Sequence, residues 1–434
     1  MIKILHTADW HLGHRLHGIS RKYEHDCFLN WLLEQIKHTQ ADVLLIAGDI
    51  FDSANPPADA QSMFYNFLIK AKQYSPLLDI IIIGGNHDSA SRLDAPSQIL
   101  ESLGIKVIGG LTRRENTSLE KNIIDWSRLI VPLTDKNGDI KAICGAMPFI
   151  RNVDINDGEM LSDCNDPLIA GVEQLYQQLY INMQDYKAEH NLSDSIGQIV
   201  TGHCYMVGTE LSELSERRIL GGNQHALPAQ IFNEAIDYVA LGHLHKAQKV
   251  TTNKNTLIHY SGSPIPLSFT ERNYQHQIMQ ICLSDSEHKT RKKITTEKIR
   301  IPRAVAIKSI PDRGYASVAK LEILINEQNF EAHDNSEHLN EPMLEVRVEL
   351  DKPEPDLRQQ IESMLEDKAV RLLKLSTHYP GKGESLAEKQ QTRLEELHPE
   401  DVFQQCYQRT FAQQAPDKIT GLFHELLESV EENK

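Results

Sequence analysis

Five short segments of the chain carry side chains that bind divalent metal ions, and each segment follows a stretch that is typical of a β-strand. They are Asp9-x-His11, Gly48-Asp49, Gly85-Asn86-His87-Asp88, Gly202-His203 and Gly242-His243-Leu244-His245. Mixed carboxylate and imidazole ligands suit Mn²⁺, Fe²⁺ or Zn²⁺, whereas an all-oxygen set would suit Mg²⁺ or Ca²⁺. A small residue before a ligand lets the backbone turn and approach a metal ion closely. Each segment alone is more typical of an ordinary turn or pair, but the five together predict a binuclear metal centre.

Asp49 is the expected bridge between the two metal ions. The apolar run at residues 43–46 is typical of a strand that is buried on both faces of a sheet, and Ala47 and Gly48 let the chain turn where that strand ends. Open α/β sheets place their sites at this carboxyl edge. Two metal ions about 3.5–4 Å apart need a shared ligand, and a carboxylate offers two oxygens. Taken alone, Asp49 is equally consistent with a helix cap or a turn residue.

The elements that must position these ligands alternate between strands and helices at first. We expect strands at residues 2–7, 43–46, 79–83 and 105–108, and helices at 21–39, 58–74 and 96–103. From about Asn122 the pattern changes to strands at 123–124, 128–132, 140–147, 198–201, 238–241, 256–260 and 277–283, with one long helix at 167–190. A repeating βαβ pattern implies a largely parallel sheet with right-handed crossovers. The sequence therefore predicts an α/β fold, a two-sheet sandwich with flanking helices that converge on one edge.

The organisation changes after about Arg300. Between residues 304 and 376, strand patterns at 304–310 and 343–350 alternate with helix patterns at 315–327 and 355–365, which predicts a small α+β domain at 301–376. Residues 376–385 are typical of a linker, and the stretch from Ser385 onward is charged and amphipathic, as in helices. We therefore expect three parts: residues 1–300, 301–376 and 377–434.

The composition is typical of a soluble globular protein. The chain has 434 residues, of which 40% are hydrophobic and 24% charged, and no apolar run approaches the roughly 18–20 residues that span a membrane. Six scattered cysteines without a CxxC pair, and an N-terminus that enters a strand pattern at once, favour a reducing cytoplasm over secretion. The net charge of −16 argues mildly against unaided DNA binding through a broad basic face, although bound cations or a basic partner would offset it.

The ordered ligand segments resemble the calcineurin-like metallophosphoesterases, whose pattern is DxH, GDxxD, GNHD or GNHE, a single His, and GHxH. Within that superfamily the chain is similar to the bacterial SbcD nucleases, a branch related to double-strand-break repair nucleases. The stretches that carry this likeness are HTADWHLG (6–13), SRKYEH (20–25), AGDIFD (47–52), GNHDS (85–89), SERRILGG (215–222), DYVALGHLHKAQ (237–248) and YSGSPIPLSF (260–269). They cover the first 270 residues. Ala8 stands where members commonly have Ser, but it is not a ligand position.

The resemblance implies a role for each site residue. Asp9, His11 and His245 would hold one metal ion, Asn86, His203 and His243 would hold the other, and Asp49 would bridge the two. His87 would protonate the leaving oxygen or stabilise its developing charge. Asp52 would orient His87, or else cap the loop before the Asn55-Pro56-Pro57 turn. Asp88 is expected to anchor its own loop.

The resemblance also implies an activity and its partners. It points to a nuclease domain at residues 1–300, a capping domain at 301–376, and C-terminal helices at 377–434 that bind an ATPase of the SbcC type. Two divalent ions, Mn²⁺ by expectation and Mg²⁺, Fe²⁺ or Zn²⁺ as alternatives, would support cleavage of DNA duplex ends, hairpins and single strands in repair, recombination and replication. We expect a homodimer within a heterotetramer, in the cytoplasm at the nucleoid, without membrane association.

Two other functions remain open from the residues alone. One is a small-molecule phosphodiesterase of the same superfamily, which would not need the long C-terminal extension. The other is a non-catalytic scaffold, against which the full ligand set and His87 argue. No G-x-x-x-x-G-K-[ST] phosphate loop occurs in the sequence, so any ATP dependence would come from another protein chain.

A few further residues have two interpretations. Arg15, Arg21 and Lys22 would either contact DNA phosphates near the site or lie in a solvated loop, with Arg21 in a local ion pair. His14, His17, His25, His225 and His259 match no position of the metal pattern and receive no role.

Overall fold

The computed structural model describes residues 1–116, 121–155, 167–210, 226–252, 255–285, 292–328, 330 and 340–380, together with 402–404, 406–408, 413–416, 419–423 and 426. The segment at 215–222, and most of the helices expected from Ser385 onward, lie outside these residues. The described residues form two compact units, one up to Ala304 and one from Val305 onward. The three-part division at residues 300 and 376 stays a prediction.

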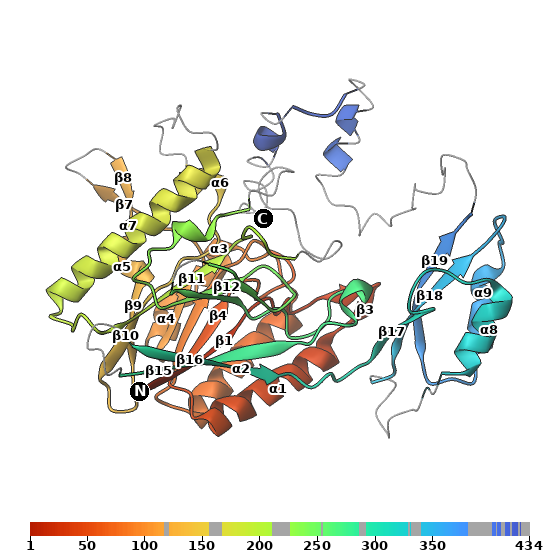
Figure 1. Cartoon of the computed structure of the whole chain (residues 1–434), viewed down its shortest axis with the longest axis horizontal. Coiled ribbons are helices and arrows are strands. Elements are labelled where there is room, and N and C mark those ends of the chain that lie inside the picture. The colour runs from red at the N-terminus through yellow and green to blue at the C-terminus, as the bar shows by residue number, and fades with distance from the viewer. Residues whose placement is uncertain are drawn as a thin grey trace. The chain divides into compact units, whose positions relative to one another are not determined.

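A mixed six-stranded sheet forms one half of the first unit (Figure 1). Its order is β16-β15-β1-β4-β5-β6. The strands are β1 (Ile2–Thr7), β4 (Val43–Ala47), β5 (Asp79–Ile83), β6 (Ile105–Ile108), β15 (Gln277–Ser284) and β16 (Lys293–Arg300). The strands β1, β4, β5 and β6 run parallel to one another, and β15 and β16 add an antiparallel edge. The ends of β1, β4 and β5 therefore deliver their following loops to one edge of the sheet.

A second six-stranded sheet has the order β13-β14-β12-β11-β10-β9. The strands are β9 (Ile130–Thr134), β10 (Ile140–Gly145), β11 (Gly197–His203), β12 (Tyr238–Gly242), β13 (Gln248–Val250) and β14 (Leu257–Tyr260). Here β10, β11, β12 and β14 are parallel, with antiparallel strands at both edges. This confirms the predicted two-sheet sandwich.

Alternation along the strands explains how the layers pack. Leu44 and Ile46 of β4 face α1 (Lys22–Thr39) and α2 (Ala58–Tyr74), which cover the outer face of the first sheet. Val43 and Leu45 point the other way and pack against the second sheet, in a core that also takes the apolar face of α7 (Pro167–Glu189). Because both faces of β4 are buried, its sequence reads as a continuous apolar run.

The other elements of the first unit are short. They are β2 (Arg15–Leu16), β3 (Ile19–Ser20), α3 (Ala90–Asp94), α4 (Ser97–Glu101), β7 (Arg113–Asn116), β8 (Lys121–Ile124), α5 (Trp126–Leu129), α6 (Asn152–Ile155), and the 3₁₀ turns η1 (Ala229–Ile231) and η2 (Phe269–Glu271). The strand expected at 128–132 begins only at Ile130, because a helical turn precedes it. Ser127 Oγ donates to Asp125 Oδ1 at 2.6 Å within that turn.

The second unit contains a parallel three-stranded sheet and two helices. The sheet order is β17 (Ile307–Ile310), β18 (Met343–Glu349) and β19 (Arg371–His378), and the helices are α8 (Val318–Asn326) and α9 (Leu357–Leu365). The sequence interpretation missed β19 and placed part of a linker on it. The register shifts opposite Leu344 and Glu345, so Leu372 and Leu375 both face the helices and the simple alternation is lost.

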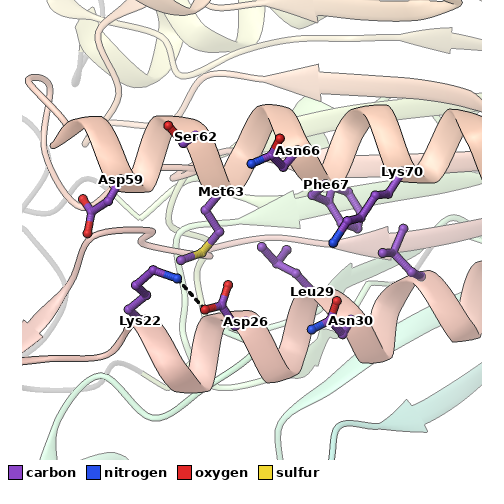
Figure 2. Close-up of a pocket in the computed structure, with 11 residues that line it drawn as sticks. Lys22, Asp26, Leu29, Asn30, Asp59, Ser62, Met63, Asn66, Phe67 and Lys70 are labelled. Atoms are coloured by element: carbon purple, nitrogen blue, oxygen red, sulfur yellow. Dashed lines mark hydrogen bonds and ion pairs between the residues drawn. The ribbon is translucent and has the colours of Figure 1, made fainter.

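A groove of about 350 Å³ lies between α1 and α2 (Figure 2). Leu29, Met63 and Phe67 contribute apolar surface to it, and Lys22 donates to Asp26 at 2.6 Å on its rim. None of the predicted metal or catalytic residues lines it, so the predicted chemistry is located elsewhere. Among the described residues, no helix is long and apolar enough to cross a membrane.

Candidate metal centre

The loops that follow β1 and β4 are hydrogen-bonded to each other at the edge of the first sheet. The Asp9 N–H donates to the Gly48 carbonyl and the His11 N–H donates to the Asp49 carbonyl, both at 3.0 Å. The second sheet meets this edge through His243, whose backbone N–H donates to Asp9 Oδ1 at 2.8 Å. Both sheets therefore contribute to one site, as the sequence predicts for this edge.

One group of ligand-type atoms comes mainly from the first sheet. Asp9, His11 and Asp49 are buried, and each offers a ligand atom within 4.8 Å of the others. His11 Nε2 lies 3.6 Å from Asp49 Oδ2. The His245 ring, from the loop after β12, is 5.1 Å from the His11 ring, centroid to centroid. Two sheets thus supply this half of the site.

A second group lies on the other side of Asp49. Asp49, His203 and His243 also offer ligand atoms within 4.8 Å of one another, and all three are buried. Asn86 Oδ1 is 2.9 Å from His203 Nε2 and 3.3 Å from His243 Nδ1. Asp49 therefore belongs to both groups, which is the position required of a bridging ligand.

The donor set fits divalent cations. Asp9 Oδ2, His11 Nε2 and His243 Nε2 are buried and have no hydrogen-bond partner among the described residues. Such orphaned polar atoms are costly unless a partner satisfies them. Burial also raises the pKa of the Asp9 carboxyl, because its negative charge lacks sufficient compensation. A metal ion on each side of Asp49 would satisfy these atoms, so the site is built for two divalent ions.

His203 shows how the protein prepares one nitrogen for a cation. Its Nδ1–H donates to the Ala47 carbonyl at 3.0 Å, so Nε2 faces Asn86 Oδ1 and lies 3.3 Å from Asp49 Oδ2. Burial alone would lower the pKa of His203, but the charge and hydrogen bond of Asp49, with the Asp9 charge and the Ala47 carbonyl, together raise the pKa to about 9. In the site, a divalent cation would take the place of that proton.

The backbone at the site is strained where the ligands are presented. Asp9, His11, Asp49 and His243 have positive φ angles of 54°, 48°, 49° and 99°. Residues other than glycine rarely adopt positive φ angles. Such angles recur at functional sites, where the surrounding structure stabilises the strained backbone. The hydrogen bonds between the β1 and β4 loops provide that support for three of these residues.

Two glycines let the loops come close together. A Cβ on Gly85 would overlap Asp49 Oδ1 and the Asp49 backbone nitrogen, and a Cβ on Gly242 would overlap the Ala47 carbonyl oxygen. We expected the small residues to admit a metal ion. In the structure these glycines instead leave room for neighbouring protein atoms, because the chain segments at the ends of β1, β4, β5 and β12 lie close together.

His87 and Asp52 lie beside the first group. The His87 ring is 4.6 Å from the His11 ring, and the His87 N–H donates to Asp49 Oδ1 at 2.8 Å. His87 Nδ1 donates to the backbone carbonyl of Asp52 at 2.8 Å. The orienting hydrogen bond therefore comes from the main chain of Asp52, not from the carboxylate that the sequence interpretation favoured.

The Asp52 carboxylate has other partners. Its Oδ1 is 3.3 Å from His11 Nδ1 and 3.0 Å from His14 Nδ1. Burial alone would raise the pKa of Asp52, but the hydrogen bond from His14 and the nearby His11 ring together hold that pKa well below its usual range. Asp52 thus remains ionised and contacts the outer nitrogen of an expected metal ligand.

Two residues of the site were missed from the sequence. His14 received no role, and Glu271 was not considered, although its carboxylate Oε1 is 2.9 Å from His245 Nδ1. Glu271 lies two residues after the YSGSPIPLSF stretch. An acidic residue so close to that stretch was the feature of the sequence that could have identified it.

Other predicted residues have structural partners. Asp88 accepts backbone N–H groups from Ile50, Phe51 and Gly85 at 2.9–3.1 Å, which confirms that it anchors its loop. Arg21 is buried and paired with Glu24, so it does not present its charge at the surface for DNA.

Family comparisons agree with this geometry. A family model described as calcineurin-like phosphoesterase matches residues 2–247, and SbcD_C, described as a type 5 capsule protein repressor C-terminal domain, matches residues 303–411. The chain is 32% identical to the SbcD component of nuclease SbcCD from Rhodobacter capsulatus over 381 residues, which are 87% of this chain and 88% of that protein. The chain belongs to the SbcD family.

Other SbcD proteins show the same likeness. The SbcD protein of Escherichia coli K12 is 29% identical over 93% of this chain and 92% of its own length. The SbcD protein of Bacillus subtilis is 35% identical over 67% of this chain and 68% of its own length. As a member of the SbcD family and of the calcineurin-like phosphoesterases, the chain is a metal-dependent phosphodiesterase of the nuclease class.

Proposed function

We propose that this chain is a Mn²⁺-dependent DNA nuclease that works with an SbcC-type ATPase. The observation that carries the proposal is the pair of ligand groups that share Asp49, with His87 beside them. The mixture of imidazole, carboxylate and amide donors favours Mn²⁺, with Fe²⁺, Zn²⁺ or Mg²⁺ as alternatives.

We assign Asp9, His11 and His245 to one ion and Asn86, His203 and His243 to the other. Asp49 would contribute its carboxylate to both. When bound, two divalent ions would activate a water nucleophile and offset the negative charge of a phosphodiester. The contact from His11 to Asp49, and that from Asn86 to His203, support this division.

His87 would supply a proton to the leaving oxygen. Its Nδ1–H is occupied by the Asp52 carbonyl at 2.8 Å, which fixes the ring and makes Nε2 the nitrogen that can deliver a proton. Asp52 would support metal binding and not proton transfer, because its carboxylate contacts the expected ligand His11 and its neighbour His14.

DNA as the substrate, and the partner, are proposed from the SbcD family. The net charge of −16 gives the chain no general attraction for a polyanion, so metal ions and the ATPase would provide it. We assign residues 1–300 to the nuclease, 301–376 to a cap, and 377–434 to contact with the ATPase. The expected assembly is a homodimer within a heterotetramer, located at the nucleoid in the cytoplasm.

The test is cleavage of a labelled hairpin duplex with Mn²⁺ or Mg²⁺. The chain would be assayed alone and with an SbcC-type ATPase plus ATP, and Asp49→Asn would serve as the inactive control. We expect Mn²⁺-dependent cutting that the partner and ATP enhance and that the variant lacks. Intact DNA, together with hydrolysis of a small phosphodiester such as bis-p-nitrophenyl phosphate, would refute the DNA substrate and leave the metal centre standing.

A further inference from the structure

Residues 261–271 connect the two sheets directly beside the metal centre. They form the first part of the connection from β14 of the second sheet to β15 of the first, and they end in the 3₁₀ turn η2. We call residues 261–271 the strap. Its first residues follow the loop of His245: the Ser263 N–H donates to the His245 carbonyl at 3.1 Å.

The end of the strap holds the His245 side chain. Glu271 is fully buried, and its Oε1 accepts a hydrogen bond from His245 Nδ1 at 2.9 Å. Its Oε2 accepts the backbone N–H of Leu267 at 2.7 Å. Both carboxylate oxygens are thus engaged, and the bond to Nδ1 directs His245 Nε2 as the nitrogen for a metal ion.

The middle of the strap reaches the ligand loop of the first sheet. The Leu267 carbonyl accepts a hydrogen bond from His14 Nε2 at 3.0 Å, and His14 Nδ1 lies 3.0 Å from Asp52 Oδ1. The same Asp52 oxygen is 3.3 Å from His11 Nδ1. The Leu267 peptide groups therefore serve both metal-binding histidines: the N–H supports His245 through Glu271, and the carbonyl supports His11 through His14 and Asp52.

We infer that the strap positions the two histidines of a single metal ion, His11 from the first sheet and His245 from the second, with Glu271 and His14 as its positioning residues. This inference rests on the proposed assignment of ligands. His203, in the other group, is held instead by the Ala47 carbonyl. The strap should therefore govern the affinity of one of the two ions, whereas a purely structural connection would affect folding without distinguishing between them.

The test is a Mn²⁺ titration of metal-free full-length protein, followed by electron paramagnetic resonance. Bound and free Mn²⁺ are counted, and an exchange-coupled pair is distinguished from a single ion. The variants are Glu271→Gln and His14→Ala, with Glu34→Gln and His38→Ala as matched controls at exposed positions of α1, away from the metal centre. Thermal melts of the metal-free proteins show whether each variant folds. His14→Ala serves if Glu271→Gln does not fold, since the His14 side chain is 18% exposed.

We expect wild type and both controls to bind two ions. Glu271→Gln in the strap, and His14→Ala at the residue that contacts it, should each keep one ion at unchanged affinity, bind the second about 10–100-fold more weakly, and lose the coupled-pair signal. The double variant should lose less affinity than the two single losses combined, because both residues act through Leu267.

The failures can be told apart. A wild type that binds no Mn²⁺ would overturn the proposed metal centre itself. A wild type that binds two ions, with folded Glu271→Gln and His14→Ala variants that bind both as tightly or lose both equally, would overturn the strap inference alone.

Discussion

At the scale of single residues, Asp49 connects every part of the site. Its side chain accepts the His87 N–H and approaches His11 and His203. Among the described residues it lies in two of the three groups of ligand-type atoms; the third consists of His11, Asp52 and His87. Its positive φ of 49° presents the carboxylate directly after β4. A carboxylate that served two ions would account for an acid buried among several histidines.

His87→Ala tests proton transfer separately from metal binding. The imidazole is expected to protonate the leaving oxygen, and loss of a general acid typically costs about 10²–10⁴-fold in rate. We expect kcat for hairpin cleavage to fall by that factor while Mn²⁺ content stays at the wild-type level. Steady-state kinetics gives kcat, and metal analysis of the same preparation gives the Mn²⁺ content.

Asp52→Asn is the matched control for that experiment. The substitution keeps the backbone carbonyl that holds His87 and changes the carboxylate that contacts His11 and His14. It should therefore weaken Mn²⁺ binding and recover rate at high Mn²⁺, which His87→Ala should not. Near-wild-type turnover by His87→Ala would contradict its role as the acid.

At the scale of elements, the sequence predicted the helices and strands that have a regular local pattern of apolar residues. The buried run of β4 and the helical spacing in α1 and α2 identified these elements to within about a residue, since hydrophobic periodicity reports burial directly. The ligand segments were recognisable because each follows a strand. The partners of those ligands were not, because Glu271 and His14 meet the site only through the path of residues 261–271, which no local pattern specifies.

The two sheets are also joined by a buried histidine. His6 on β1 donates from Nε2 to the Leu241 carbonyl of β12 and accepts from the Tyr238 hydroxyl at Nδ1, at 3.2 and 3.1 Å. Burial, aided by the nearby His259, lowers the pKa of His6 to about 3. The folded protein therefore keeps His6 neutral at pH values where the unfolded chain, with a pKa near 6.5, is protonated.

His6→Gln tests this contact through the pH dependence of stability. A lowered histidine pKa gives stability that is complete above about pH 6.5 and is lost as the pH falls toward 3. Between pH 7 and pH 5 the wild type should lose about 2 kcal/mol more unfolding free energy than His6→Gln, which cannot take up that proton. Urea unfolding with a chelator present measures both. Equal losses in the two proteins would show that His6 is not kept neutral.

At the scale of the whole molecule, charge and site chemistry must be considered together. A net charge of −16 on 434 residues repels a polyanionic substrate, and the buried carboxylates of the metal centre add to that repulsion until cations bind. Metal loading would satisfy the buried ligand atoms and lower, at the site itself, the electrostatic barrier to DNA. The second unit carries its own core, in which α8 and α9 pack on one face of its sheet.

The central claim is that two ions share Asp49 between ligands from the two sheets. The most direct measurement is the anomalous scattering of crystals grown with Mn²⁺. We predict two anomalous peaks per chain, about 3.5–4 Å apart, with Asp49 coordinating both, His11 and His245 at one, and His203 and His243 at the other. A single peak, or two peaks that do not share Asp49, would contradict this claim.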